Sequence, residues 1–167
     1  MSFTGGQYAA QGRRLLNDVN EIVPTNTKIA YAPFQAEFKG FCDSKHPNDQ
    51  FPHCVTEEKL FGFLWYQAYH EKRPRNQKHD TFDVNDYDHV VAAHPPGRTS
   101  QFTEEELQTS NYPGFSTWEK CYSAMMSLAK QQRSKNSNNT EWQDFKTDRL
   151  ESLKCLVKCR QSYIKRA

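Results

Sequence analysis

The chain lacks the segments that would carry it to or through a membrane. Its first residues, MSFTGGQYAAQGRR, contain no apolar core of the kind that a secretory signal peptide needs. No apolar run approaches the roughly 20 residues of a membrane-spanning helix. The five cysteines are an odd number without regular spacing, so a secreted disulfide framework is not indicated. We expect an intracellular, reduced protein with a single domain, because 167 residues suffice for one hydrophobic core.

The short motifs of common catalytic sites are also missing. There is no G-x-S-x-G turn, phosphate-binding loop, H-E-x-x-H helix or dinucleotide fingerprint. Asp83, Asp86 and Asp88 lie close together, but helix capping explains them better than acid–base chemistry. Tyr163 lies among cations that would suit an attack on phosphate, yet no general acid accompanies it. We therefore expect no enzyme activity, no cofactor and no small-molecule substrate.

Alternating strand patterns are nearly absent, and helical spacing dominates the chain. Aromatic residues make up 13% of it, which is more than a disordered chain would carry. We expect an all-α, compact bundle of about six helices. An N-terminal helical arm over residues 1–24, with a helix from Tyr8 to Val19, would precede one helical domain over residues 25–167.

Two helices are expected before residue 75. Apolar residues recur at helical spacing up to Cys42, which predicts a helix capped at Asn26 or Thr27 with Pro33 in its first turn. A second helix, VTEEKLFGFLWYQAY, begins at a Thr56 cap and is stopped by Pro74. We expect its buried side to consist of Leu60, Phe61, Leu64, Trp65 and Ala68.

The rest of the chain predicts a short helix and two longer ones. The short helix is capped near Asp83 or Asn85 and closed by the Pro-Pro-Gly that follows it. Ser116 or Thr117 opens a helix that runs to about residue 135, and Thr140 caps the last helix. The expected core positions of these two helices are Trp118, Cys121, Tyr122, Met125, Leu128, Trp142, Phe145, Leu150, Leu153, Val157 and Ile164.

Positive charge is concentrated in two segments although the net charge is only +2. The segment from His70 to His79 carries four Lys or Arg against one acid, and the segment from Glu141 to Ala167 carries seven against four. A local basic patch indicates a nucleic-acid partner better than total charge does. Solvated side chains, or cations that stabilise a helix C-terminus, are the plainer explanation. The candidate phosphate contacts are Lys72, Arg73, Arg75, Lys78, Lys130, Arg133, Lys135, Lys154, Lys158, Arg160, Lys165 and Arg166.

The last helix carries the most regular of these groups. Lys154, Lys158, Gln161 and Lys165 recur at steps of four, three and four, which predicts a stripe distinct from the apolar face. A third group, Lys130, Arg133 and Lys135, lies at the end of the preceding helix, and the three basic groups together would make a phosphate-contacting surface.

Cysteine and histidine offer one irregular constellation and one pair. The pattern C-x3-H-x6-H-C contains zinc-competent residue types, but its spacing is not that of a standard finger, so we expect no structural zinc. Its members are Cys42, His46, His53 and Cys54. Cys155 and Cys159 are four residues apart on one expected helix, and we expect both to be packing residues.

Four stretches in this order resemble the N-terminal helical region of Crypton-type tyrosine recombinases and their domesticated fungal relatives, which include a centromere-binding kinetochore protein and transcription factors. They are YAPFQAEFKGFCDSK, VTEEKLFGFLWYQAY, FSTWEKCYSAMMSLAKQQ and EWQDFKTDRLESLKCLVKCRQSYIKR. The resemblance covers about residues 27–166. It is carried by Tyr31, Phe38, Phe41 and Cys42, by Val55 to Leu64, by Gln131 and Gln132, and by Leu153 to Arg160.

The resemblance implies a fold and a partner. In that family the helical region is similar to the SAM-like core-binding domain of phage-type integrases, which clamps one side of the duplex. A separate C-terminal domain holds the Arg/His/Arg triad and the tyrosine, and this chain ends where that domain would start. The implied function is a nuclear, transposon-derived module that binds double-stranded DNA and is non-catalytic by itself. The alternative left open is a helical protein-interaction module that self-associates and binds no nucleic acid.

Overall fold

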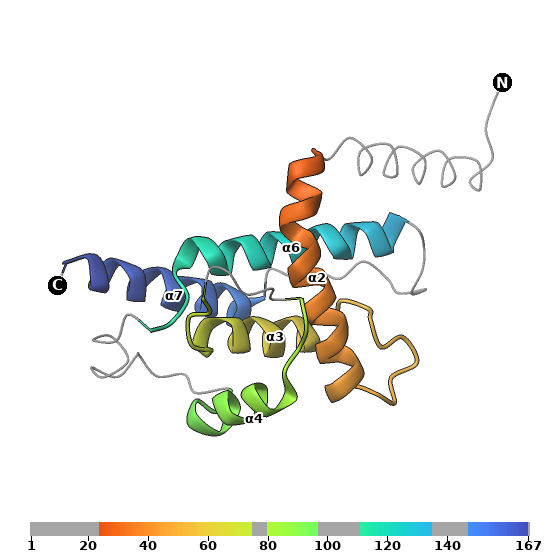
Figure 1. Ribbon diagram of the computed structural model, residues 1–167, viewed down its shortest axis with the longest axis horizontal. Helices are drawn as coiled ribbons and strands as arrows, with labels where there is room; N and C mark the ends of the chain where they lie inside the picture. Colours follow the sequence, from red (N-terminus) through yellow and green to blue (C-terminus); the bar gives the residue numbers. More distant parts are fainter. Residues whose placement is uncertain (1–23, 75–79, 97–110, 135–146, 167) are drawn as a thin grey trace.

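The structure, a computed structural model, describes residues 24–74, 80–96, 111–134 and 147–166, and the side chains of the last helix up to residue 162. Within these ranges the chain forms five α-helices and no strand (Figure 1). They are α2 (Thr25–Lys45), α3 (Glu57–Tyr69), α4 (Val84–Ala93), α6 (Phe115–Ser134) and α7 (Asp148–Arg166). The expected all-α bundle is confirmed. The count of six helices and the arm over residues 1–24, with its helix from Tyr8 to Val19, involve residues outside the described ranges.

The central element of the bundle is α3, which packs against each of the other four helices. From Lys59 to Tyr69 every residue except Gly62 is buried. The five apolar positions expected to be buried are confirmed, but the expectation of a single buried side is incomplete. A helix that is covered on all sides carries apolar residues all round, and α3 adds Phe63, Tyr66 and Tyr69 to the expected set.

Side-chain caps start two of the helices where the sequence predicts them. The Thr56 hydroxyl accepts a hydrogen bond from the backbone N–H of Lys59 at 3.3 Å. The Asp83 carboxylate accepts from the N–H groups of Asn85 and Asp86 at 3.0 and 3.2 Å. Such bonds satisfy N–H groups that have no partner within the helix.

Other helix ends differ from the expectation. Helix α2 begins at Thr25 after an N-cap at Pro24, so the expected cap at Asn26 or Thr27 is wrong and Pro33 lies inside the helix. Helix α3 ends at Tyr69, well before Pro74, so proline does not stop it directly. Helix α6 begins just ahead of the predicted cap residues, at Phe115.

The start of the last helix also differs from the expectation. Within the described residues α7 begins at Asp148, where the Thr147 hydroxyl accepts from the N–H of Leu150 at 3.5 Å. The predicted cap at Thr140 lies outside the described residues.

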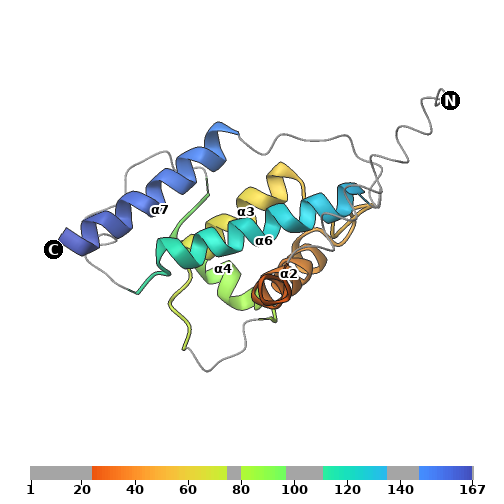
Figure 2. The ribbon, with the colours of Figure 1, turned by 90° about the horizontal axis from the view of Figure 1, so that it is seen from above.

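Helices α6 and α7 run antiparallel beside α3 (Figures 1 and 2). The Trp118 side chain of α6 is 1% exposed, and its indole N–H donates to the Leu64 carbonyl of α3 at 3.0 Å. Leu150, Leu153 and Val157 bury the inner face of α7. The last helix is therefore held on the bundle by apolar packing along much of its length.

A buried ionic network joins α2 to the segment that follows α3. The Glu37 side chain is fully buried, and its carboxylate accepts two hydrogen bonds from the Arg73 guanidinium, at 2.7 and 2.9 Å, and one from the Gln67 amide at 3.0 Å. Arg73 also donates to the Tyr66 hydroxyl, which donates to Asp86 of α4 at 2.6 Å. Burial alone would lower the pKa of Arg73, but the bonds and charge of Glu37 raise it. The guanidinium is therefore held charged inside the protein.

We expect Arg73→Ala to lower the free energy of unfolding by about 3–5 kcal/mol, because it leaves the Glu37 carboxylate buried without its counter-charge. The matched control is Lys72→Ala at the preceding, exposed position, for which the change should stay within about 0.5 kcal/mol. Urea denaturation of the two variants and the parent measures both values. An Arg73→Ala protein as stable as the parent would contradict the structural role of this pair.

Candidate nucleic-acid interface

Two of the candidate phosphate contacts, Arg73 and Arg160, are directed into the protein. Arg73 is paired with the buried Glu37 carboxylate, as described above. The Arg160 side chain is 2% exposed, and its guanidinium lies 4.9 Å from the centre of the Tyr112 ring and 5.7 Å from that of Tyr69. It also donates to the Pro113 carbonyl at 3.1 Å. Both arginines are thus engaged with the protein itself and are poorly placed to meet a DNA backbone.

The lysines of the predicted stripe on α7 lie along the edge that faces α6. The Lys154 ammonium lies 5.6 Å from the centre of the Tyr122 ring of α6. Gln161 accepts a hydrogen bond from the N–H of Phe115 at 2.5 Å, at the start of α6. Lys158, between these two positions, is exposed. Lys165 and Arg166 belong to the last turn of α7, and their side chains are outside the described part.

Lys72 lies near the same part of α7. Its backbone N–H donates to the Asn111 carbonyl at 2.6 Å, and its side chain is exposed. It lines a small cavity of about 60 Å³ together with Val157 and Gln161 of α7. The structure therefore brings Lys72 and the α7 stripe to neighbouring positions. Arg75 and Lys78, which follow in the sequence, lie outside the described residues.

The remaining cations are at the other end of the molecule. Lys130 and Arg133 are exposed in the last two turns of α6. Because α6 and α7 are antiparallel, the C-terminal ends of the two helices point to opposite ends of the bundle in both views (Figures 1 and 2). Lys135 is outside the described residues. Among the described residues, the candidates that face outward thus fall into two separate groups rather than one surface.

A groove that the sequence did not predict lies where α3, α4, α7 and the end of α2 meet. Its volume is about 790 Å³, and aromatic and aliphatic side chains form most of its wall. The apolar lining comprises Phe41, Phe61, Trp65, Tyr87, Leu153 and Leu156. Each of these residues belongs to a helical pattern of the sequence, but no pattern indicated that four elements meet at this place.

Two ion pairs lie at the rim of this groove. Arg149 donates to the Glu57 carboxylate at 2.5 and 2.7 Å, and its guanidinium covers the Phe61 ring at 4.3 Å. Hydrogen bonding from Arg149 holds the pKa of Glu57 below its usual range. Lys45 pairs with Asp88 on the opposite side. The groove is therefore an apolar surface with a polar rim, to which Glu58 and Asp148 add two acids.

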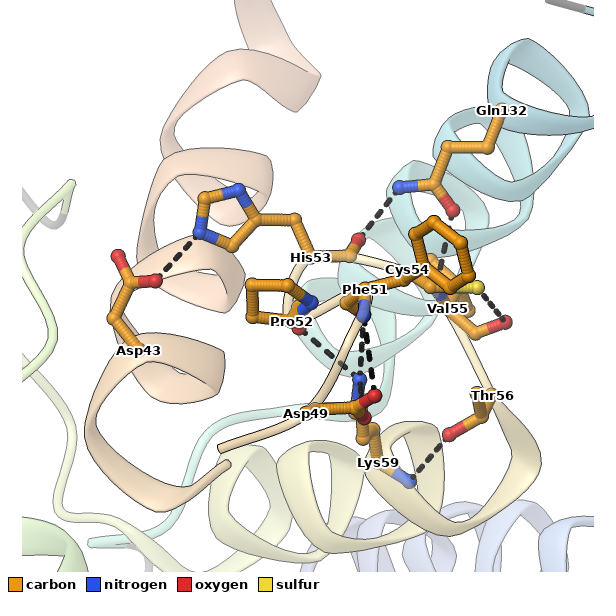
Figure 3. Close-up of polar contacts among 10 residues, drawn as sticks. All are labelled: Asp43, Asp49, Phe51, Pro52, His53, Cys54, Val55, Thr56, Lys59 and Gln132. Carbon is orange, nitrogen blue, oxygen red and sulfur yellow. Dashed lines mark hydrogen bonds and ion pairs between the residues drawn. The ribbon is translucent and has the colours of Figure 1, made fainter. Parts of the chain in front are cut away.

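The residues of the C-x3-H-x6-H-C pattern have other contacts in the structure, and Figure 3 shows those of His53 and Cys54. Cys42 is buried in α2, and burial raises the pKa of its thiol to about 12. The buried Cys54 thiol donates to the Val55 carbonyl, and His53 pairs with Asp43 at 2.7 Å. His46 packs edge-on against the ring of an α2 phenylalanine. Among the described residues no group of three or more His, Cys, Asp or Glu is placed to hold a metal ion.

The loop that contains this pattern is instead held by a buried lysine and a glutamine. The Lys59 ammonium reaches from α3 to Asp49 at 2.6 Å and to the carbonyls of Phe51 and Pro52 at 3.0 and 3.1 Å (Figure 3). From α6, the Gln132 amide donates to the His53 carbonyl at 2.6 Å and accepts from the N–H of Val55 at 2.9 Å. These contacts fix the loop against two helices.

The expectation that Cys155 and Cys159 pack in the core is wrong, because both side chains are exposed. The inner face of α7 is formed by Leu153 and Val157, and each cysteine follows one of these by two residues, about 200° around the helix. The pair therefore lies on the outer side of α7.

Comparison of the chain with family models, with curated proteins and with solved structures found no match. Among the described residues no helix combines the length and the apolar composition that crossing a bilayer requires.

We expect the ion pair between Asp49 and Lys59 to make stability fall with acid. Hydrogen bonds from Lys59 and from the N–H of Phe51 lower the pKa of Asp49 below its ordinary 3.8. A carboxyl whose pKa is lower in the folded state stabilises above its unfolded pKa, and this contribution is lost as pH falls through the folded value. Urea denaturation from about pH 5 down to about pH 3 should show a smaller loss for Asp49→Asn than for the parent.

The control for this measurement is Glu119→Gln on the exposed face of α6, which should follow the parent's acid dependence. If Asp49→Asn loses stability with acid as steeply as the parent does, the ion pair does not contribute in the folded state.

Proposed function

We propose that this chain is a DNA-binding helical module, non-catalytic by itself, that contacts the phosphate backbone of double-stranded DNA through the lysine stripe of α7. The observation that carries the proposal is the exposure of Lys158, next to Lys154, on a helix whose inner face is packed into the core. Lysines on a rigid element can meet a run of phosphates without first ordering a flexible segment. Lys72 adds a further exposed cation beside the same helix.

The resemblance to Crypton-type recombinases supports the finer part of the proposal, in which a bundle of about six helices resembles the SAM-like core-binding domain and acts in the nucleus. Residues from two of the similar stretches contact one another in the fold. Val55, Thr56, Lys59 and Gln132 meet at one junction of α3, α6 and the loop between α2 and α3. The catalytic triad of that family has no counterpart in the chain, so the proposed module binds the duplex without cleaving it.

The salt dependence of retention on duplex DNA tests this proposal. The parent should lose affinity steeply with salt, and Lys158→Ala should lower the slope of log K against log salt by about 0.9, the value for one lost phosphate contact. Unrelated duplex sequences should be affected about equally, because a phosphate contact carries no base information. Lys39→Ala, at an exposed position of α2, is the matched control and should keep the parent's slope.

Melting temperatures of the variants establish that each is folded. A parent protein that duplex DNA does not retain at low salt would overturn the DNA-binding function. Retention with the same slope in the parent and in Lys158→Ala would overturn the assignment to α7 and leave Lys130, at the other end of the bundle, as the next position to test.

The groove at the meeting of α3, α4 and α7 favours a second candidate, the helical protein-interaction module. Its occupant would be an amphipathic helix of a partner protein or of a second copy. Inside its polar rim the groove has an apolar lining, on which an apolar helix face can be buried. This function requires neither the lysine stripe nor DNA.

We expect Leu156→Glu, which places a charge in the groove wall, to abolish self-association if the groove mediates it, while leaving DNA retention unchanged. Light scattering at increasing protein concentration measures the mass, and Lys158→Ala is the reciprocal control. A mass that rises with concentration equally in the parent and in Leu156→Glu would exclude the groove as the contact.

A further inference from the structure

Helix α7 exposes two free thiols side by side. Cys155 and Cys159 are exposed, whereas the other three cysteines of the chain are buried. Residues four apart on a helix lie on the same face, with about 5–6 Å between their Cβ atoms. Neither thiol is part of the lysine stripe or of the groove lining.

A disulfide between these two residues does not fit the helix. Disulfide bonds need Cβ atoms about 3.5–4.5 Å apart, which is less than the spacing that the intact helix sets. The same Cβ spacing leaves room for one metal ion between the two thiols. The pair is therefore better suited to hold a bridging ion than to oxidise within one chain.

The number and type of the ligands, two thiols, indicate which metal ion this pair would bind. Zinc in a structural site takes four ligands, and the described residues contain no group of three or more His, Cys, Asp or Glu placed to hold a metal. Thiolates are soft ligands and favour Cu(I), which is stable with two thiolates in a near-linear arrangement. Two thiolates and one Cu(I) carry a charge of −1, and Lys154 and Lys158 directly precede the two cysteines.

We propose that Cys155 and Cys159 form a two-thiolate site for Cu(I) on the outer face of α7. On binding, each thiol releases its proton to water and each sulfur forms one bond to the ion. Neither the copper nor the sulfur changes oxidation state. The site does not depend on the proposed DNA contact.

Anaerobic titration of the reduced protein with Cu(I), in competition with the coloured chelator bicinchoninate, tests the site. The parent should take up one equivalent per chain at chelator concentrations that leave the Cys155→Ser/Cys159→Ser double variant empty. Either single serine variant should lose affinity by more than the roughly 100-fold that removal of an outer-shell partner costs.

The matched control keeps two exposed thiols but separates them. Cys159→Ser with Ser162→Cys moves one thiol to a position seven residues from Cys155, about 10.5 Å along the helix, and should bind Cu(I) as weakly as a single variant. Circular dichroism establishes that α7 is retained in each protein.

Three results would overturn the proposal. The first is a parent that takes no Cu(I) from the chelator, and the second is a relocated pair that binds as tightly as the parent. The third is half an equivalent per chain with a doubled mass, which would mean that the ion joins two chains instead of two residues of one helix.

Discussion

The full burial of the Glu37 carboxylate is the constraint on which the arrangement of the first three described helices depends. A buried carboxylate stays charged only when a counter-charge and hydrogen bonds replace its water. Arg73 and Gln67 supply these bonds from the segment after α3 and from α3 itself. Through Tyr66 the same network reaches Asp86 of α4. The polar contacts thereby fix how α2 and α4 sit on the apolar surface of α3.

The chemistry of the cationic side chains explains which of them bond to groups of the protein and which stay exposed to solvent. A guanidinium is planar, can bond a carboxylate with two parallel hydrogen bonds and stacks on aromatic rings, whereas an ammonium is a strongly hydrated point charge. Arg73 and Arg160 use these properties against a carboxylate and against tyrosine rings. Lys72 and Lys158 remain exposed. Lys59 is the exception among the lysines that the structure describes, and it is buried because a carboxylate and two carbonyls surround its ammonium.

Three residues from the stretches that resemble the recombinases form structural contacts at one junction of the fold. Thr56 starts α3, Lys59 holds the preceding loop, and Gln132 of α6 bonds the backbone of the same loop on both sides of Cys54. Such residues indicate an architecture rather than a partner. The proposed function therefore depends on the surface, and on α7 above all, where apolar packing on one side leaves lysines and thiols on the other.

Local physical rules allowed part of this protein to be predicted from its sequence alone. The caps at Thr56 and Asp83 need only a hydroxyl or carboxylate before a helix, and the burial of Leu64, Trp118 and Leu153 follows from helical spacing. The tertiary structure decided what depends on residues far apart in the chain. It placed Arg73 on Glu37 and the Arg160 guanidinium beside the Tyr112 ring, turned Cys155 outward and formed the groove. A sequence pattern shows that a side chain is charged, but only packing decides whether that charge meets water, a carboxylate or an aromatic ring.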